Sequence, residues 1–162
     1  MQAVPAYVGI GSNLGDPVAR VRQAIDALAG MTRTRLVLQS SLYGSTPMGP
    51  VAQPDYCNAV AGVLTELDAD TLFLALRAIE SRLGREPPRE RWGPRIIDLD
   101  LLVFGEQRRH STELTLPHPG IAARHFVLQP LNEIAPDLWI PGLGRVAQCA
   151  AKVPTSGLWR IQ

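Results

Sequence analysis

Cysteine and lysine are scarce in this chain. Its 162 residues include two cysteines, and Lys152 is the single lysine among sixteen basic residues. Two cysteines cannot build the disulfide framework of a small secreted domain, and Cys57 and Cys149 lack the spacing of metal ligands. We therefore expect neither a disulfide scaffold nor a zinc site, and we expect Cys57 to pack in a strand as a small hydrophobic side chain.

Long apolar runs and a strong net charge are also missing. No apolar run approaches 18 residues, and no charged region followed by an apolar one opens the chain, so we expect a cytoplasmic protein without a membrane partner. The net charge is +1, whereas general polyanion binders are more basic, so we expect no nucleic-acid partner. A hydrophobic content of 46% with 19% charged residues excludes disorder, and residues 1–162 are expected to form a single domain.

Hydrophobic periodicity and turn residues predict alternating strands and helices. Asp16 and Pro17 predict a helix start, and Gly30 predicts its end. The predicted strands cover 6–10, 32–43, 56–67 and 96–104, and the predicted helices cover 17–29 and 70–83. This β-α-β-β-α-β order is typical of an α+β, ferredoxin-like fold with a mostly antiparallel sheet. A hairpin around Gly105-Glu106, a helix over 126–134 and a short strand over 138–140 are expected to follow.

The strand after residue 95 carries two aspartates. Because side chains alternate along a strand, Asp98 and Asp100 point the same way and lie about 6–7 Å apart. The same pattern predicts that Ile96 and Leu102 share their face and that Ile97, Leu99, Leu101 and Val103 fill the other. Like charges on a covered strand need a cation, and Mg²⁺ is typically held by one or two carboxylates plus substrate phosphates. We therefore predict a metal site at Asp98 and Asp100.

An arginine-rich segment leads into these aspartates. Residues 77–95 contain six arginines and three glutamates, a local net charge of +3. A loop rich in proline and glycine that delivers Arg95 next to a metal site is typical of a phosphate clamp. Phosphoryl transfer fits this pattern, because it needs positioning and charge stabilisation rather than a protein nucleophile, and no nucleophile–base pair stands out.

The glycines at 9, 11 and 15 suggest an alternative function, that of a dinucleotide oxidoreductase. They follow a strand and precede a helix, but their spacing matches the dinucleotide fingerprint loosely, and the antiparallel order disagrees with a parallel Rossmann sheet. We expect instead a tight turn that places Asn13 near a site. A non-enzymatic, ferredoxin-like regulatory or RNA-binding module is the remaining alternative, although such modules present aromatic side chains on strands and here they flank loops.

Five separated segments resemble one known family. They are Arg91 to Leu102, Gly9 to Gly15, Gln53 to Val60, Leu116 to Pro119, and Phe126 together with Pro130 to Pro136. Taken in their order along the chain, they resemble the 6-hydroxymethyl-7,8-dihydropterin pyrophosphokinases of folate biosynthesis, over roughly residues 6–141. The resemblance implies a three-layer αβα sandwich, consistent with the order of elements above.

The resemblance also implies an activity and a site. ATP, the co-substrate, would donate its β,γ-diphosphate to the hydroxymethyl group of 6-hydroxymethyl-7,8-dihydropterin, leaving AMP. Asp98 and Asp100 would hold two Mg²⁺ ions, and Arg85 and Arg95 would act on the phosphates. The residues implied to bind the pterin are Ser45, Thr46, Met48, Tyr56, Asn58, Trp92 and Phe126. Those implied to bind ATP or organise its site are Arg77, Glu80, Arg85, Arg95, Thr115, His118 and Arg124. We expect a monomer.

Overall fold

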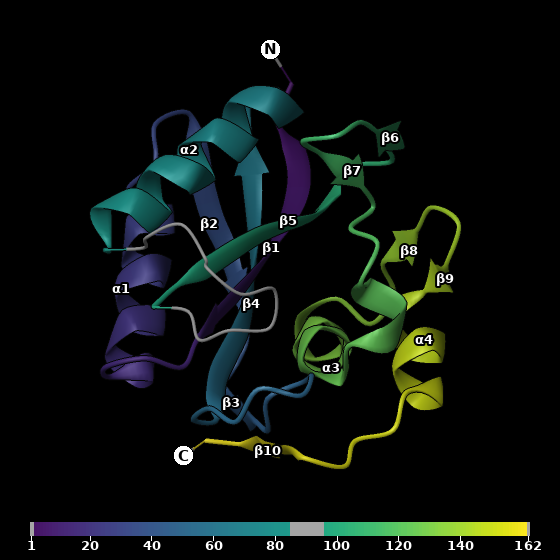
Figure 1. Cartoon of the computed structure of the whole chain (residues 1–162). Coiled ribbons are helices and arrows are strands. Elements are labelled where there is room, and N and C mark those ends of the chain that lie inside the picture. Colours follow the sequence, from purple (N-terminus) through teal and green to yellow (C-terminus); the bar gives the residue numbers. More distant parts are fainter. Residues whose placement is uncertain (1, 85–95, 162) are drawn as a thin grey trace.

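A six-stranded antiparallel sheet forms the centre of the fold (Figure 1). The computed structural model describes residues 2–84 and 96–161. The strands of the sheet are β1 (Val4–Ser12), β2 (Thr34–Gln39), β3 (Tyr43–Ser45), β4 (Tyr56–Thr65), β5 (Asp98–Phe104) and β10 (Leu158–Arg160). Their order is β10-β3-β4-β1-β5, and β2 also pairs with β4. The neighbours β5-β1-β4-β2 reproduce the ferredoxin-like order, so the predicted core is confirmed.

Two helices cover one face of the sheet (Figure 1). They are α1 (Pro17–Ala29) and α2 (Ala69–Arg82). Each begins at an aspartate that accepts a hydrogen bond from the first turn, Asp16 from Ala19 N–H and Asp68 from Thr71 N–H. Their buried positions, such as Leu28 and Leu72, pack on the apolar side chains of β1, β4 and β5. Cys57 joins this core, as predicted, and burial raises the pKa of its thiol to about 11.

On the other face of the sheet α3 (His125–Ile134) packs against the strands, and α4 (Val146–Lys152) lies against α3 (Figure 1). Leu128 and Leu131 of α3 are fully buried against Val60 of β4 and Leu102 of β5. The sheet thus lies between two helical layers, and the predicted αβα sandwich is confirmed. No helix in residues 2–84 or 96–161 is long and apolar enough to cross a membrane.

The strand predicted over 32–43 is wrong in detail, because it is two strands. Both β2 and β3 pair with β4, and the chain leaves the ladder between them. Ser40 Oγ accepts a hydrogen bond from Val60 N–H, and Ser41 N–H is donated to the Glu133 carboxylate on α3. A partner 92 residues away therefore interrupts the strand.

The predicted faces of β5 are partly wrong. The ladder between β1 and β5 shifts register between Tyr7 and Val8, opposite Leu101 and Val103. Leu102 and Val103 consequently both pack in the core beneath α3, although we expected Val103 on the other face. Ile96 precedes the strand and packs against the core beneath α1 and α2 instead of sharing the aspartate face.

The predicted hairpin around Gly105-Glu106 is also wrong. A turn does occur there, because Gln107 N–H donates to Phe104 C=O, but the strand that follows it does not pair with β5. The next strands, β6 (Arg109–His110) and β7 (Thr115–Leu116), pair with each other. The short helix η1 (Ile121–Ala123) precedes α3, and the predicted strand after α3 is β8 (Trp139–Ile140), paired with β9 (Gly144–Arg145).

Candidate active site

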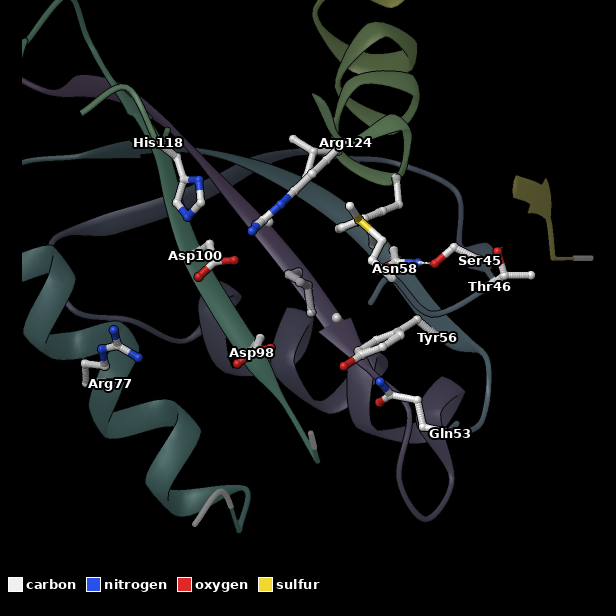
Figure 2. Close-up of a pocket in the computed structure, with 17 residues that line it drawn as sticks. Ser45, Thr46, Gln53, Tyr56, Asn58, Arg77, Asp98, Asp100, His118 and Arg124 are labelled. Atoms are coloured by element: carbon white, nitrogen blue, oxygen red, sulfur yellow. Dashed lines mark hydrogen bonds between the residues drawn. The ribbon is translucent and has the colours of Figure 1, made fainter. Parts of the chain in front are cut away.

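A cavity of about 280 Å³ crosses the face of the sheet at the N-terminal end of α3 (Figure 2). Four strands contribute to its floor, β5, β1, β4 and β3, and α2 and α3 contribute to its sides. The lining residues are Gly9, Ile10, Gly11, Ser45, Thr46, Met48, Gln53, Tyr56, Asn58, Ala59, Arg77, Asp98, Asp100, His118, Arg124, Phe126 and Val127. The carboxylates lie at one end and the neutral polar and aromatic side chains at the other.

The carboxylate end is formed by Asp98 and Asp100, which are half-buried and alternate with the buried Leu99. In the ladder with β1, Asp98 lies opposite Gly11 and Asp100 lies opposite Gly9. Because glycine has no side chain, the floor beside both carboxylates is open. A Cβ at Gly11 would lie 3.3 Å from Asn58 Oδ1, so the same glycine connects the carboxylate end to the amide end.

Glu80 supports the strand between the two aspartates. Its carboxylate is buried, and Oε2 accepts a hydrogen bond of 2.7 Å from Leu99 N–H. Its Oε1 accepts from Arg77 Nη1 at 3.0 Å, and the Arg77 guanidinium also lies 4.8 Å from the centre of the Phe73 ring. Glu80 therefore fixes both the backbone of β5 and the arginine that faces the carboxylates across the cavity.

His118 and Arg124 lie above the carboxylate end (Figure 2). His118 N–H is donated to Leu102 C=O, which holds the residue against β5. Its Nδ1 accepts a hydrogen bond of 3.0 Å from Gly120 N–H. Burial and the neighbouring Arg124 guanidinium lower the pKa of His118 to about 4. At neutral pH the ring is therefore uncharged, and since Nδ1 accepts, Nε2 carries the proton.

Asn58 is the centre of the other end. It is buried on β4, and its Nδ2 donates to Ser45 Oγ at 2.8 Å and to Tyr43 C=O. Both donated bonds go to β3, so Asn58 Oδ1 faces the glycine floor. Tyr56 precedes it by two residues on the same strand and lies on the same side of the sheet.

Asn13 holds residues 53–54, which lead into β4. Its Nδ2 donates to Gln53 Oε1 at 2.8 Å and to Pro54 C=O at 2.9 Å, and Gln53 lines the cavity. The predicted role of Asn13 in a tight turn near a site therefore agrees with its position, although Asn13 acts through Gln53.

The structure brings most of the predicted site residues together. Those that line the cavity are Ser45, Thr46, Met48, Tyr56, Asn58, Arg77, Asp98, Asp100, His118, Arg124 and Phe126. Glu80 lies beneath β5 rather than on the surface of the cavity. Thr115 is outside it, on β7, where its hydroxyl is within 3.4 Å of Ser111 C=O. Arg85, Trp92 and Arg95 lie outside the described residues.

Sequence reasoning missed part of the lining. Gly9, Gly11 and Gln53 were not predicted to line the site, and neither were Ile10, Ala59 and Val127. The signal for the glycines was present in the sequence: two glycines alternate on a strand as two aspartates alternate on another. It could not be used, because only the register of β1 against β5 places one pair opposite the other.

Comparison with known proteins agrees with this geometry. The model of the family 7,8-dihydro-6-hydroxymethylpterin-pyrophosphokinase (HPPK) matches residues 7–136. The chain belongs to this family. The HPPK resemblance read from the sequence is therefore confirmed, and so is the predicted enzyme class, because curated relatives carry the name 2-amino-4-hydroxy-6-hydroxymethyldihydropteridine pyrophosphokinase. The relative from Pseudomonas aeruginosa is 44% identical over 155 residues, which cover 96% of the chain and 95% of the relative.

A second HPPK relative, from Haemophilus influenzae, is 45% identical over 138 residues, covering 85% of the chain and 86% of the relative. Among solved structures, wild-type Plasmodium falciparum HPPK-DHPS with STZ-DHP is similar with a TM-score of 0.73 at 13% identity. That match covers 93% of this chain, which spans only 43% of the Plasmodium chain. At such low identity the likeness concerns the fold, which is that of the HPPK part.

Proposed function

We propose that this chain transfers the β,γ-diphosphate of ATP to the hydroxymethyl group of 6-hydroxymethyl-7,8-dihydropterin, a step of folate biosynthesis that leaves AMP. The observation that carries the proposal is the cavity itself: an acidic end at Asp98 and Asp100 is joined over the floor of Gly9 and Gly11 to an amide and aromatic end at Asn58. A substrate pair made of a polyphosphate and a flat heterocycle fits such a division. The confirmed family membership supports the same pair.

The amide end suits the pterin. A pterin ring carries an amino group and ring N–H groups, which need acceptors, and Asn58 Oδ1 is an acceptor that faces the floor. Asn58 Nδ2 is held by Ser45 and Tyr43, so the orientation of the amide is set before the substrate arrives. The Tyr56 ring lies at the same end, and the Phe126 ring, whose centre lies 5.9 Å from the Arg124 guanidinium carbon, also lines the cavity, so both supply apolar surface for the faces of the heterocycle. Trp92, outside the described residues, is proposed to join them.

The other end suits polyphosphate. Arg77 and Arg124 place two guanidinium groups on the cavity, and arginine binds phosphate oxygens in a fixed fork. His118 is neutral at pH 7, so it offers an Nε2–H donor without a full charge. Arg85 and Arg95 are proposed to contact the phosphates during transfer, on the resemblance alone, because they lie outside the described residues.

The two aspartates fit Mg²⁺. Asp98 and Asp100 would be the protein ligands, because both lie half-buried on β5 and line the cavity. Mg²⁺ commonly takes one or two carboxylates and completes its shell with water and substrate phosphates, which is compatible with this donor set. Two bound ions would neutralise the developing charge on the transferred diphosphate. The number of ions is part of the proposal.

The reaction is a single displacement. The hydroxymethyl oxygen forms a bond to the β-phosphorus of ATP, and the bond from that phosphorus to the oxygen bridging to the α-phosphate breaks. AMP departs with the bridging oxygen, and the hydroxyl proton goes to Asp100 or to water. The protein holds the two reactants on one floor and supplies positive charge, which is the main requirement of phosphoryl transfer.

Incubation with ATP, Mg²⁺ and the hydroxymethyl dihydropterin tests this function. We expect AMP and the pterin diphosphate in equal amounts, whereas ADP or inorganic phosphate would contradict the proposal. Asp98→Asn and Asp100→Asn should each lower turnover by at least about a thousandfold while the protein stays folded. Asp137→Asn is the matched control, because Asp137 is exposed, pairs with Arg145 and lies outside the cavity.

The remaining predictions from the sequence belong to the same proposal. They are a single domain over 1–162, a monomer, and a cytoplasmic location. Gel filtration checks the oligomeric state. The RNA-binding alternative gains no support, because α3 packs on the face of the sheet that such a module would present to RNA.

A further inference from the structure

Strand β10 forms an edge of the sheet beside the cavity. It pairs with β3 through Leu158, Trp159 and Arg160, far along the chain from their partners Ser45, Gly44 and Tyr43. Strand β3 is only three residues long, and Ser45 and the following Thr46 line the cavity. So short a strand gains much of its order from its neighbours, and β10 is the neighbour on its outer side.

Two contacts join β10 directly to this wall. Thr46 N–H donates a hydrogen bond of 3.0 Å to Gly157 C=O. The Trp159 indole lies over Gly44, so closely that a Cβ at Gly44 would clash with Trp159 Cε2. The indole thus occupies the place of a side chain one residue before Ser45, and only glycine leaves room for it.

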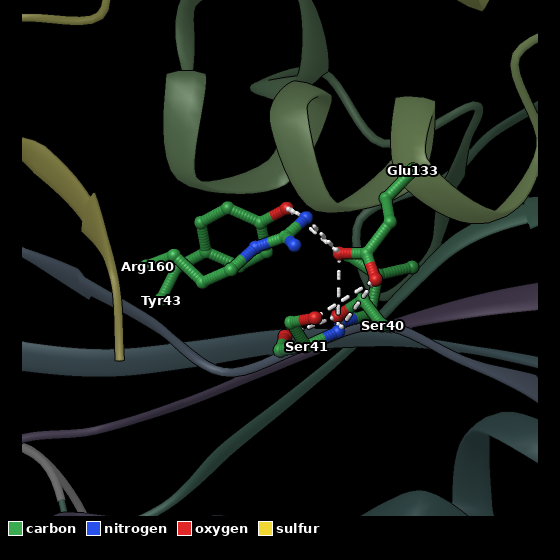
Figure 3. A network of polar contacts seen from close by, with 6 residues as sticks. Ser40, Ser41, Tyr43, Glu133 and Arg160 are labelled. Atoms are coloured by element: carbon green, nitrogen blue, oxygen red, sulfur yellow. Dashed lines mark hydrogen bonds and ion pairs between the residues drawn. The ribbon is translucent and has the colours of Figure 1, made fainter. Parts of the chain in front are cut away.

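The same segment is held to α3 at two points. His125, at the start of α3, has Nε2 2.9 Å from Ser156 C=O. Two turns later, Glu133 Oε1 accepts from Tyr43 OH at 2.7 Å and lies 3.3 Å from Arg160 Nη2 (Figure 3). Arg160 Nη2 also donates to Tyr43 OH at 3.1 Å, which closes the network. The segment therefore contacts both β3 and α3, and each of these two elements contributes residues to the lining of the cavity.

We propose that residues 156–160, which we call the strap, set the separation between the Ser45–Thr46 wall and Phe126 on α3, and so determine the affinity of the cavity for the heterocycle. Trp159 and Arg160 act as positioning residues through Gly44 and Tyr43. The inference rests on the proposed function for the identity of the ligand. At the phosphate end, Asp98 and Asp100 lie on β5 and Arg77 lies on α2. The contacts of Trp159 and Arg160 described above are made to β3 and Glu133 instead, so the affinity for nucleotide should change little when these two residues are replaced.

Calorimetric binding of 6-hydroxymethyl-7,8-dihydropterin to single variants tests the strap. We expect Trp159→Ala and Arg160→Ala to raise the dissociation constant of the pterin by about fivefold to tenfold, the effect of about one net hydrogen bond or a similar contact. The dissociation constant of α,β-methylene-ATP should change by less than about twofold. In turnover, KM for the pterin should rise while kcat changes little, and Trp159→Phe should restore most of the affinity.

Two matched controls lie on the separate β8–β9 pair. Trp139 is 65% exposed on β8, and Arg145 forms an ion pair of 3.6 Å with Asp137. Trp139→Ala and Arg145→Ala remove the same residue types without touching β3, so both should bind pterin as the wild-type protein does. An equal loss of pterin affinity in these controls would overturn the inference, since the effect would then not be specific to the strap.

A double-mutant cycle tests the contact itself. Gly44→Ala should displace the indole and weaken pterin binding, but in the Trp159→Ala background the added methyl group has room. We therefore expect the double variant to bind no more weakly than Trp159→Ala alone, whereas additive losses would show that Trp159 does not act through Gly44. Hydrogen exchange of the Thr46 amide should also be faster in Trp159→Ala, and an unchanged rate would overturn the inference.

The results that would overturn the strap inference differ from those that would overturn the proposed function. Wild-type protein that makes AMP and binds pterin, together with strap variants that bind it equally well, overturns the strap alone. Wild-type protein that neither makes AMP nor binds pterin overturns the proposed function and the ligand assigned to this wall.

Discussion

His118 gives the fold a dependence on pH that can be worked out from its surroundings. Burial and the Arg124 guanidinium lower the pKa of His118 from 6.5 to about 4 in the folded protein. The unfolded chain therefore binds more protons than the folded one between these two values. By linkage, the free energy of unfolding is greatest above pH 6.5, falls as pH decreases through 6.5, and reaches its full loss near pH 4.

The size of the effect follows from the two pKa values. A group with an unfolded pKa of 6.5 and a folded pKa of about 4 makes the free energy of unfolding up to about 2 kcal/mol lower at pH 5 than at pH 8. A variant without an ionisable ring should lose this contribution. His118→Asn is suited to the purpose, because Asn Oδ1 can take the place of Nδ1 as the acceptor for Gly120 N–H.

Urea denaturation in EDTA, from pH 8 to pH 5, measures this contribution. We expect the free energy of unfolding of the wild-type protein to fall by about 2 kcal/mol more than that of His118→Asn over this range. Carboxylates titrate in both proteins, so their contribution cancels in the difference. Parallel pH profiles of the two proteins would refute the reasoning, because they would mean that His118 takes up its proton as readily in the folded state as in the unfolded one.

Two buried side chains near the site give further stability predictions, both measured by urea denaturation at pH 8. Glu80→Ala leaves the buried Leu99 N–H without its acceptor and should lower the free energy of unfolding by about 2–4 kcal/mol. Glu80→Gln keeps an acceptor and should lower it by less than half as much. Equal losses in the two variants would contradict the role of that hydrogen bond. Leu128→Ala opens a cavity beneath α3 and should cost about 2–5 kcal/mol, and a loss below about 1 kcal/mol would contradict its packing role.

The parts of the fold that depend on neighbouring residues could be predicted from the sequence. Asp16 and Pro17 begin α1 and Gly30 ends it, as their local chemistry requires. The parts that depend on distant residues could not. The break between β2 and β3 is made by Glu133 on α3, and the two faces of β5 change at a register shift against Tyr7 and Val8. Neither partner can be identified from local periodicity.

The features of the site also divide into those that depend on neighbouring residues and those that depend on distant ones. Alternation along one strand was enough to put Asp98 and Asp100 on the same face, and their position in the cavity agrees with this. The pairing of Asn58 with Ser45 and the support of Leu99 by Glu80 need the folded chain, because each joins different elements. The roles of Arg85, Trp92 and Arg95 stay predictions, since these residues lie outside the described part of the chain.

The glycines opposite the aspartates explain why the two ends of the cavity can serve one reaction. In-line transfer requires the hydroxymethyl oxygen and the β-phosphorus to come within about 3–3.5 Å, so the heterocycle and the polyphosphate must share one unobstructed floor. A Cβ at Gly11 would lie 3.3 Å from Asn58 Oδ1, and one at Gly9 would lie 3.4 Å from Leu102 Cδ2. Asp98 lies opposite Gly11 in the ladder between β5 and β1. Any larger side chain at residue 11 would therefore stand between the Asn58 amide and the Asp98 carboxylate. The absence of side chains at Gly9 and Gly11 is therefore as much a part of this site as the carboxylates on β5.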